Sequence, residues 1–195
     1  MEIYRKGAEA NLYRDDGRLI KERVRKNYRI PEIDERLRRQ RTASEAKNLE
    51  RALEFGVKVP KVLKFDKRNF TLEMEYVEGD LVKDLIDRGQ RVPELSSEIG
   101  AILRKLHDNN LVHNDLTTSN LISTPSGIYI IDFGLAYHTT RLEDKAMDLV
   151  VFKKSIQAGH TLQAQEIWDN LLVGYRPGRE TMARVETIEK RVRYK

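Results

Sequence analysis

Two short motifs contain residues of the types that phosphoryl transfer requires. The first, HNDLTTSN, begins at His113 and includes Asp115 and Asn120; the second, DFG, begins at Asp132, twelve residues after Asn120. Phosphoryl transfer needs a carboxylate near the attacking oxygen and separate oxygen ligands that hold magnesium against the phosphates. The spacing H-x-D-x-x-x-x-N followed by D-F-G therefore predicts that Asp115 orients the attacking group and that Asn120 and Asp132 bind Mg²⁺.

Each of these residues has a plainer interpretation when it is taken alone. An Asp in a polar loop commonly forms a turn, a Phe-Gly pair commonly ends a strand, and a lone His such as His113 more often packs or bonds the backbone. The two motifs nevertheless occur in the required order, each beside a predicted strand. This joint agreement favours the catalytic interpretation.

A lysine and a glutamate upstream complete the predicted phosphate site. Lys21 lies in the third predicted strand, the position from which a lysine can reach the α- and β-phosphates of a nucleotide. Its carboxylate partner on the following helix is expected to be Glu45, with Glu50 as the less favoured choice. The alternative for Glu45 is a helix capping box with Thr42, because the two residues fit the pattern S/T-x-x-E.

Contacts to ATP are predicted from weaker patterns. Residues 7–10 keep one glycine of the pattern G-x-G-x-x-G, and their amides can still cover phosphates, although Glu9 brings a negative charge towards them unless it turns away. Residues 74–77 end the fifth predicted strand, where backbone groups can bond the adenine edge. The expected ATP-binding residues are Gly7, Ala8, Glu9, Ala10, Lys21, Glu75 and Val77.

The elements that must position these residues form two units. Residues 31–55 repeat apolar side chains every three or four positions, which predicts one or two helices followed by Gly56. The N-terminal unit also contains five predicted strands, at residues 2–6, 11–14, 18–24, 59–65 and 70–77. Beyond residue 78 the pattern becomes helical, at residues 81–88, 94–110, 143–175 and 179–193, with a loop at 111–120 and short strands at 121–122 and 128–131.

These elements predict an α+β fold of the two-lobed, protein-kinase-like kind. The expected domains are an N-lobe, residues 1–78, which carries the phosphate loop, the lysine and the glutamate helix, and a minimal helical C-lobe, residues 79–195. The chain has no cysteine, which excludes disulfides and thiolate chemistry. It also has no apolar run of the roughly 20 residues that would span a bilayer, so we expect a cytoplasmic protein without membrane contact.

The positive charge of the chain is concentrated in two segments. Residues 18–41 hold ten Lys or Arg against four acidic residues, and residues 176–195 hold seven against three, although the net charge of the whole chain is only +5. Such segments are either solvated helix faces or surfaces for nucleic acid or an acidic partner.

The chain resembles a very small atypical protein kinase, and most resembles the kinase/ATPase subunit of the KEOPS complex, the PRPK family. The most specific stretches are residues 20–34 (IKERVRKNYRIPEID) and 41–45 (RTASE), and residues 7–10 and 74–79 are also similar. The resemblance implies an atypical Ser/Thr kinase or ATPase that uses Mg²⁺ and ATP and takes part in making threonylcarbamoyl-adenosine in tRNA. The implied partners are the threonylcarbamoyl-transferase subunit, a small activator subunit and, through the assembled complex, tRNA.

Two departures from ordinary kinases narrow this expectation. Position 114 is Asn where the usual loop has Arg, and no A-P-E sequence follows Gly134 before Asp148, which we expect to anchor the catalytic loop through backbone bonds. These losses favour ATP hydrolysis or phosphorylation of a narrow set of substrates. The alternatives are a small-molecule kinase and a pseudokinase scaffold without activity.

The C-terminus carries four positive charges in its last six residues, at Lys190, Arg191, Arg193 and Lys195. One interpretation is a solvated helix end, where cations complement the helix dipole. The resemblance implies another, a flexible basic tail near the partner's active site and the tRNA.

Overall fold

The N-terminal lobe is built on a five-stranded antiparallel sheet with the strand order β1-β2-β3-β5-β4. The computed structural model describes residues 2–7 and 9–193, and within these ranges it describes side chains from residue 3 to residue 191. The β2–β3 hairpin turns at Asp16 and Gly17, whose φ angles of 40° and 73° suit a tight hairpin turn. The strands are β1 (Glu2–Lys6), β2 (Ala10–Asp15), β3 (Arg18–Arg23), β4 (Val62–Asp66) and β5 (Thr71–Glu75).

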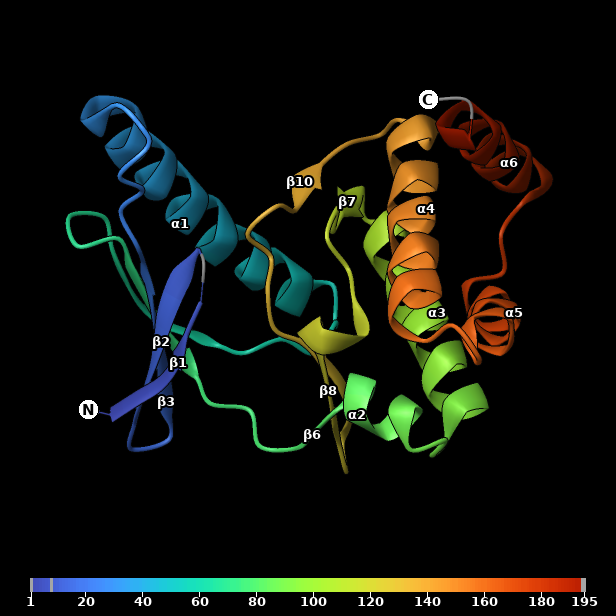
Figure 1. Ribbon diagram of the computed structural model, residues 1–195, viewed down its shortest axis with the longest axis horizontal. Coiled ribbons are helices and arrows are strands. Elements are labelled where there is room, and N and C mark those ends of the chain that lie inside the picture. Colours follow the sequence, from blue (N-terminus) through green and yellow to red (C-terminus); the bar gives the residue numbers. More distant parts are fainter. Residues whose placement is uncertain (1, 8, 194–195) are drawn as a thin grey trace.

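A single long helix, α1 (Pro31–Glu54), packs against β4 and β5, so the region that allowed one or two helices forms one. Pro31 stands in its first turn, where the missing N–H costs nothing. Gly56, with a φ angle of 72°, follows the end of the helix and reverses the chain. In Figure 1 the sheet lies at the left and the helices of the second lobe at the right, with α1 reaching from one towards the other.

The second lobe is mainly helical and holds two small sheets, β6-β8-β9 and β10-β7. The β8–β9 hairpin carries the end of the first motif on one side and leads into the second motif on the other, as the sequence predicts. The elements are β6 (Asp80–Leu81), α2 (Val82–Asp87), α3 (Val92–Asp108), β7 (Leu111–Val112), the 3₁₀ helix η1 (Thr118–Asn120), β8 (Leu121–Thr124), β9 (Gly127–Ile130), β10 (Tyr137–His138), α4 (Leu142–Gly159), α5 (Ala164–Tyr175) and α6 (Arg179–Arg193).

The prediction of continuous helix over residues 143–175 is wrong, because the chain breaks at His160. This residue has φ −135° and ψ 55°, outside the helical region. Its imidazole is buried, with Nδ1 2.8 Å from Asp87 Oδ1 and Nε2 2.8 Å from Thr118 Oγ1. Helix α4 thus ends at Gly159, a residue type that weakens a helix, and contacts to residues more than 40 positions away hold His160 in its non-helical conformation.

The strand predicted to begin at Val59 begins instead at Val62. Val57 and Val59 are each only 2% exposed and turn into the core rather than alternating along the sheet. The carbonyl of Lys58 accepts a hydrogen bond of 3.0 Å from the amide of Ile130 in β9. The segment before β4 thus connects the two lobes.

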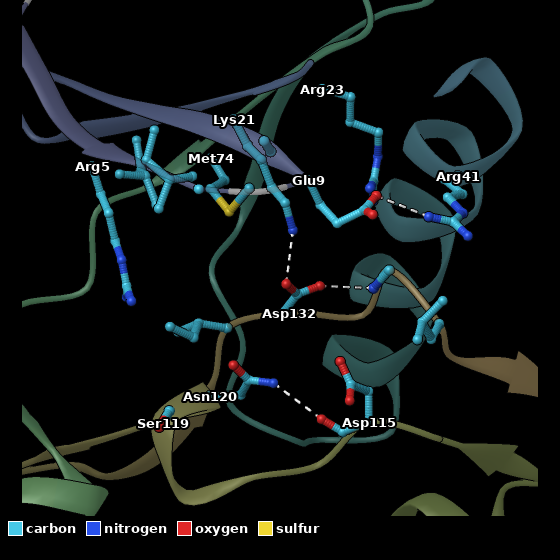
Figure 2. A pocket seen from close by; sticks show the side chains of 17 residues that line it. Arg5, Glu9, Lys21, Arg23, Arg41, Met74, Asp115, Ser119, Asn120 and Asp132 are labelled. Atoms are coloured by element: carbon cyan, nitrogen blue, oxygen red, sulfur yellow. Dashed lines mark hydrogen bonds and ion pairs between the residues drawn. The ribbon is translucent and has the colours of Figure 1, made fainter. Parts of the chain in front are cut away.

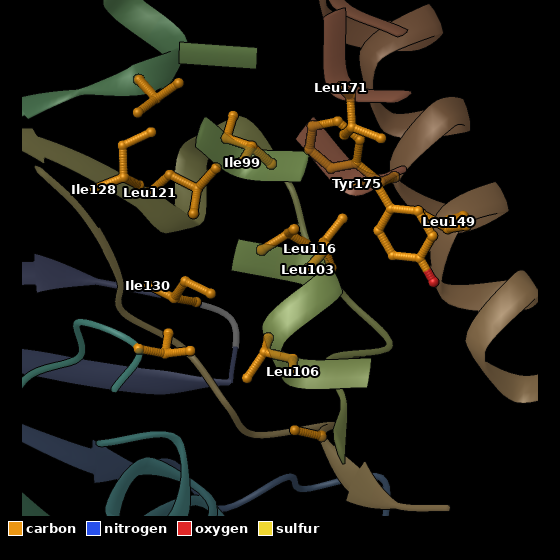
Figure 3. Close-up of a cluster of buried hydrophobic side chains, with 14 of the residues drawn as sticks. Ile99, Leu103, Leu106, Leu116, Leu121, Ile128, Ile130, Leu149, Leu171 and Tyr175 are labelled. Carbon is orange, nitrogen blue, oxygen red and sulfur yellow. The ribbon is translucent and has the colours of Figure 1, made fainter. Parts of the chain in front are cut away.

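The core of the second lobe lies where α3 meets α5 and the β8–β9 hairpin. Leu103 and Leu106 of α3, Leu171 and Tyr175 of α5 and the apolar side chains of the hairpin belong to one buried cluster (Figure 3). The helices approach closely because Gly100 and Gly174 have no Cβ; a methyl group at either position would collide with the backbone of the other helix. This core supports the hairpin that carries the two motifs. In the described part of the chain, no helix is long and apolar enough to cross a membrane.

Candidate functional site

The predicted motif residues meet in a cavity of about 460 Å³ between the two lobes. Lys21 extends from β3 towards Asp132, and Asn120 and Asp115 lie on the opposite side of the cavity (Figure 2). Gly7, Glu9 and Ala10 of the predicted phosphate loop form part of the lining. Residues that are far apart in the sequence thus share one site, as the two motifs predict.

Lys21 forms the ion pair that the sequence predicts. Its Nζ lies 2.6 Å from Glu45 Oε1 on α1 and 3.0 Å from Asp132 Oδ2. Glu50, the less favoured choice, lies on the exposed face of the helix. The capping-box alternative for Glu45 is wrong, because Thr42 lies well inside α1 and donates its hydroxyl hydrogen bond to the carbonyl of Arg38.

A second cation, which the motifs do not identify, also binds Glu45. Arg23 Nη2 donates a hydrogen bond of 2.5 Å to Glu45 Oε2, and the arginine is only 6% exposed. Arg23 lies two residues after Lys21 on the same strand, so both side chains point to the same face of the sheet. That spacing was the one available signal. Arg5 and Arg41 also line the cavity, and the two motifs identify neither as a site residue.

The electrostatics keep the proposed metal ligand ionised. Burial opposes ionisation of Asp132, but the Lys21 ammonium and the hydrogen bond of 2.9 Å from the Gly134 amide outweigh it and lower the pKa of Asp132 to about 2. Partial burial, assisted by the charge of Asp132, raises the pKa of Asp115. The two carboxyl groups therefore differ, one suited to a metal ion and one to a proton.

Asp148 anchors the catalytic loop, as predicted. Its Oδ2 accepts a hydrogen bond of 2.7 Å from the His113 amide, and its Oδ1 accepts one of 2.7 Å from the Asn114 amide. His107 Nε2 lies 3.0 Å from the same carboxylate. Burial opposes the charge of Asp148, but these hydrogen bonds and the nearby imidazoles lower its pKa. Asn114 has a φ angle of 63°, a left-handed conformation that Asn adopts more readily than Arg does.

Asn120 is oriented by the loop that it ends. Its Nδ2 donates a hydrogen bond of 3.0 Å to the carbonyl of Asp115, which leaves its Oδ1 as the free acceptor of the side chain. The contact between the side chains of Thr118 and His160 stabilises the 3₁₀ turn that ends at Asn120. In the described residues no cluster of three or more His, Cys, Asp or Glu side chains could hold a metal. Asn120 Oδ1 and the carboxylate of Asp132 are oxygen ligands of the kind that Mg²⁺ prefers, and Mg²⁺ commonly takes its other ligands from phosphate and water.

The predicted phosphate loop is closed by its own backbone and held to α1. The Gly7 amide donates a hydrogen bond of 3.0 Å to the carbonyl of Ala10. The Glu9 carboxylate turns sideways, where it accepts a hydrogen bond of 3.0 Å from Arg41 Nη1 and lies 3.9 Å from Lys26 Nζ. These cations offset the charge that we expected Glu9 to bring towards the phosphates. Ala8 lies outside the described residues.

The residues predicted to contact adenine do not line the cavity. Leu19 and Met74 line its wall, whereas Glu75 and Val77 do not. The Glu75 amide already donates to the carbonyl of Lys61 at 2.9 Å. The adenine contacts of Glu75 and Val77 stay predictions.

The basic C-terminal segment is helical rather than flexible as far as it is described. Helix α6 continues to Arg193, and Arg191 Nη1 lies 3.2 Å from Glu143 Oε1 of α4. Lys190 is exposed. The side chain of Arg193 and the whole of Lys195 lie outside the described residues.

Comparisons with known proteins identify the family and the fold of the chain. A family model described as the RIO domain matches residues 2–151. KEOPS complex subunit Bud32 from Pyrococcus abyssi is 38% identical over 213 residues, which cover 100% of this chain and 97% of the relative. A probable bifunctional tRNA threonylcarbamoyladenosine biosynthesis protein from Methanocaldococcus jannaschii is 41% identical over 197 residues. That alignment covers 97% of this chain but only 36% of the relative, so the chain spans about a third of such proteins.

Solved structures support the fold. The Rio2 kinase from Chaetomium thermophilum, described as a complex with ADP, Mg²⁺ and phosphoaspartate, aligns with 100% of this chain and 72% of its own, with a TM-score of 0.64 at 14% identity. The bifunctional kinase-methyltransferase WbdD aligns with 88% of this chain and 44% of its own, with a TM-score of 0.59 at 16% identity. The chain therefore has a kinase-like fold and belongs to the RIO-domain family of atypical kinases, ATP-dependent phosphotransferases, and within it to the family of KEOPS complex subunit Bud32.

Proposed function

We propose that this chain is the Mg²⁺- and ATP-dependent kinase/ATPase subunit of a KEOPS-type assembly that makes threonylcarbamoyl-adenosine in tRNA. The observation that carries the proposal is the convergence of Lys21, Asp115, Asn120 and Asp132 on one interlobe cavity. Relatives named for this complex and this modification supply the cellular context. We expect the assembly to act in the cytoplasm.

The roles of the residues follow from their positions. Lys21, held by Glu45, contacts the α- and β-phosphates, while the loop that begins at Gly7 and ends at Ala10 covers them. Bound Mg²⁺, held by Asn120 and Asp132, would neutralise charge on the phosphate oxygens. Asp115 orients the attacking water or hydroxyl and accepts its proton, and partial burial supports that role by raising the pKa of its carboxyl group. In this assignment residues 1–78 hold the nucleotide and residues 79–195 supply the reacting groups.

The absence of a usual phosphate-sensing arginine directs the activity towards ATP turnover within a complex. Position 114 is a left-handed Asn, and β10, the only strand described between the DFG motif and α4, is two residues long. Such a short segment offers little platform for a peptide substrate. We therefore propose that the transferase subunit, the small activator subunit and tRNA set the rate of ATP hydrolysis.

The first test is phosphate release from Mg²⁺-ATP by the purified chain, alone and with the transferase subunit and tRNA. Replacing Lys21 by Met should lower turnover roughly 10- to 100-fold, because a charge-assisted contact to phosphate is lost. Lys64→Met is the matched control, since Lys64 also lies on the sheet but its side chain is 66% exposed. If the Lys21→Met variant hydrolyses ATP at the wild-type rate, the assignment of Lys21 to the phosphate site is wrong.

The second test concerns the basic C-terminus. Deleting residues 190–195 should leave the fold and ATP binding intact, because Lys190 is exposed and Arg191 contacts only the surface residue Glu143 among described partners. The assembled complex should modify tRNA more slowly, and each lost phosphate contact should reduce the salt slope of tRNA binding by about one unit. If the complex with the truncated chain modifies tRNA at the full rate, residues 190–195 are only a solvated helix end.

A further inference from the structure

Glu45 is held by more positive charge than its pairing with Lys21 requires. Its side chain is 1% exposed, and it receives Lys21 on one oxygen and Arg23 on the other, at 2.6 and 2.5 Å. A buried carboxylate needs a partner, since an unpaired buried charge is strongly destabilising. One cation would meet that need, so the second calls for an explanation.

The Lys21 ammonium contacts two carboxylates at the same time. Besides Glu45, its ammonium lies 3.0 Å from Asp132 Oδ2. Under the proposed function, on which this inference rests, the same ammonium must also reach the nucleotide phosphates. If Lys21 were the only cation at Glu45, each movement of its ammonium towards the phosphates would weaken the pairing of a buried charge.

Arg23 is placed to remove this conflict. It is buried, and its guanidinium is fixed between α1, through Glu45, and the turn of the second motif. A Cβ added to Gly134 would lie 2.9 Å from Arg23 Nη2 and 3.1 Å from Asp132 Oδ1. The φ angle of Gly134 is not positive, so the need for glycine there is one of space. Arg23 therefore occupies the room that Gly134 leaves.

We propose that Arg23 is a positioning residue that holds Glu45, and with it α1, in place by itself, so that Lys21 is free to serve the phosphates. Arg23 touches Glu45 and lies against the backbone of Gly134, and it needs no contact with the nucleotide for this role. The division of labour gives Glu45 a fixed partner and a mobile one. The sequence motifs identify only the mobile partner, Lys21.

The test compares two ligands, ADP and adenosine, whose dissociation constants are measured by isothermal titration calorimetry on the folded full-length chain. Arg23→Gln should weaken ADP about tenfold, because Lys21 must then stay at Glu45 and part of a charge-assisted contact is lost. Adenosine, which has no phosphate, should bind as before. Arg23→Lys keeps a cation near Glu45 and should restore most of the affinity for ADP.

The matched control is Arg39→Gln, an arginine on α1 whose ion pair with Glu35 is exposed and distant from the cavity. It should change neither affinity. Arg23→Gln that weakens ADP and adenosine by the same factor would overturn the proposal, because the arginine would then be a packing residue only. Unchanged ADP affinity would also overturn it. Should Arg23→Gln not fold, Arg23→Lys decides: most of the ADP affinity with unchanged adenosine affinity supports the proposal, and an equal loss of affinity for both ligands contradicts it.

Lys21→Met separates this inference from the proposed function. If the wild-type chain does not bind ADP, or if Lys21→Met leaves ADP binding unchanged, the proposed function fails. If Lys21→Met weakens ADP but Arg23→Gln does not, only the inference fails. Thermal unfolding adds a second readout. Lys21→Met and Arg23→Gln should each lower Tm by a few degrees. The variant that combines the two should lower Tm by more than the sum of the single losses, because Glu45 is then left without a cation. Additive losses would contradict a shared role.

Discussion

Replacing Asp132 by Ala should lower the rate of ATP turnover by roughly a thousandfold or more. Asp132 is the carboxylate whose pKa lies at about 2, so it is fully ionised at neutral pH and suited to bind Mg²⁺. Without it, Asn120 is the only proposed protein ligand for the metal. The measurement is phosphate release at saturating Mg²⁺ and ATP.

The fold should survive this change, because Lys21 keeps its partner Glu45 at 2.6 Å. Circular dichroism and thermal unfolding check that point. Asp169→Ala is the control, since Asp169 is an exposed aspartate on α5 that bonds Gln165. Chelating Mg²⁺ from the wild-type protein should produce a loss similar to that of Asp132→Ala. Undiminished ATP consumption by Asp132→Ala would overturn the metal-site assignment.

Replacing Asp148 by Asn should destabilise the protein by about 2 to 4 kcal/mol and slow ATP turnover roughly 100-fold. The carboxylate accepts hydrogen bonds from two consecutive amides, those of His113 and Asn114. An Asn side chain has only one acceptor oxygen, so its NH₂ group would face one of these donors. The loop that carries Asp115 would then lose its fixed position. Urea unfolding measures the stability and phosphate release the rate.

The stability difference between wild type and Asp148→Asn should depend on pH. The pKa of Asp148 in the folded protein is lower than its ordinary value of 3.8, so the carboxylate contributes stability above that pH. The contribution is lost as pH falls through the folded-state pKa, and the two proteins should converge in acid. Asp169→Asn serves as the control, because Asp169 is an exposed aspartate on α5, away from the loop that Asp148 holds. A difference that stays constant down to pH 2 would contradict the charge-based account.

The side chains at the cavity are supported by side chains that are more deeply buried. Lys21 and Asp132 lie at the cavity, with side chains 11% and 40% exposed, whereas Glu45, which binds Lys21, and Arg23, which binds Glu45, are 1% and 6% exposed. Buried ion pairs do not necessarily add stability over apolar packing, but removing one partner is costly. Glu45 and Arg23 therefore define one arrangement, and Lys21 and Asp132 stay at the cavity, where the proposed function places the nucleotide.

Local sequence determined the reacting groups. The spacing of Asp115, Asn120 and Asp132 follows from the lengths of a loop and a tight hairpin, and a local motif can encode both. Alternating strands and a long periodic segment likewise predicted the sheet and α1. Asp148 was found because it follows the second motif at a short distance along the chain.

Tertiary structure decided the features that depend on distant contacts. Arg23 and Arg41 read as surface cations in a basic segment, and only the packing of α1 against the sheet puts them beside Glu45 and Glu9. The break at His160 depends on Asp87 and Thr118, which are far from it in sequence. Periodicity reports the face that a residue occupies, but it does not report which charge lies opposite, because that pairing is set by how separate elements pack.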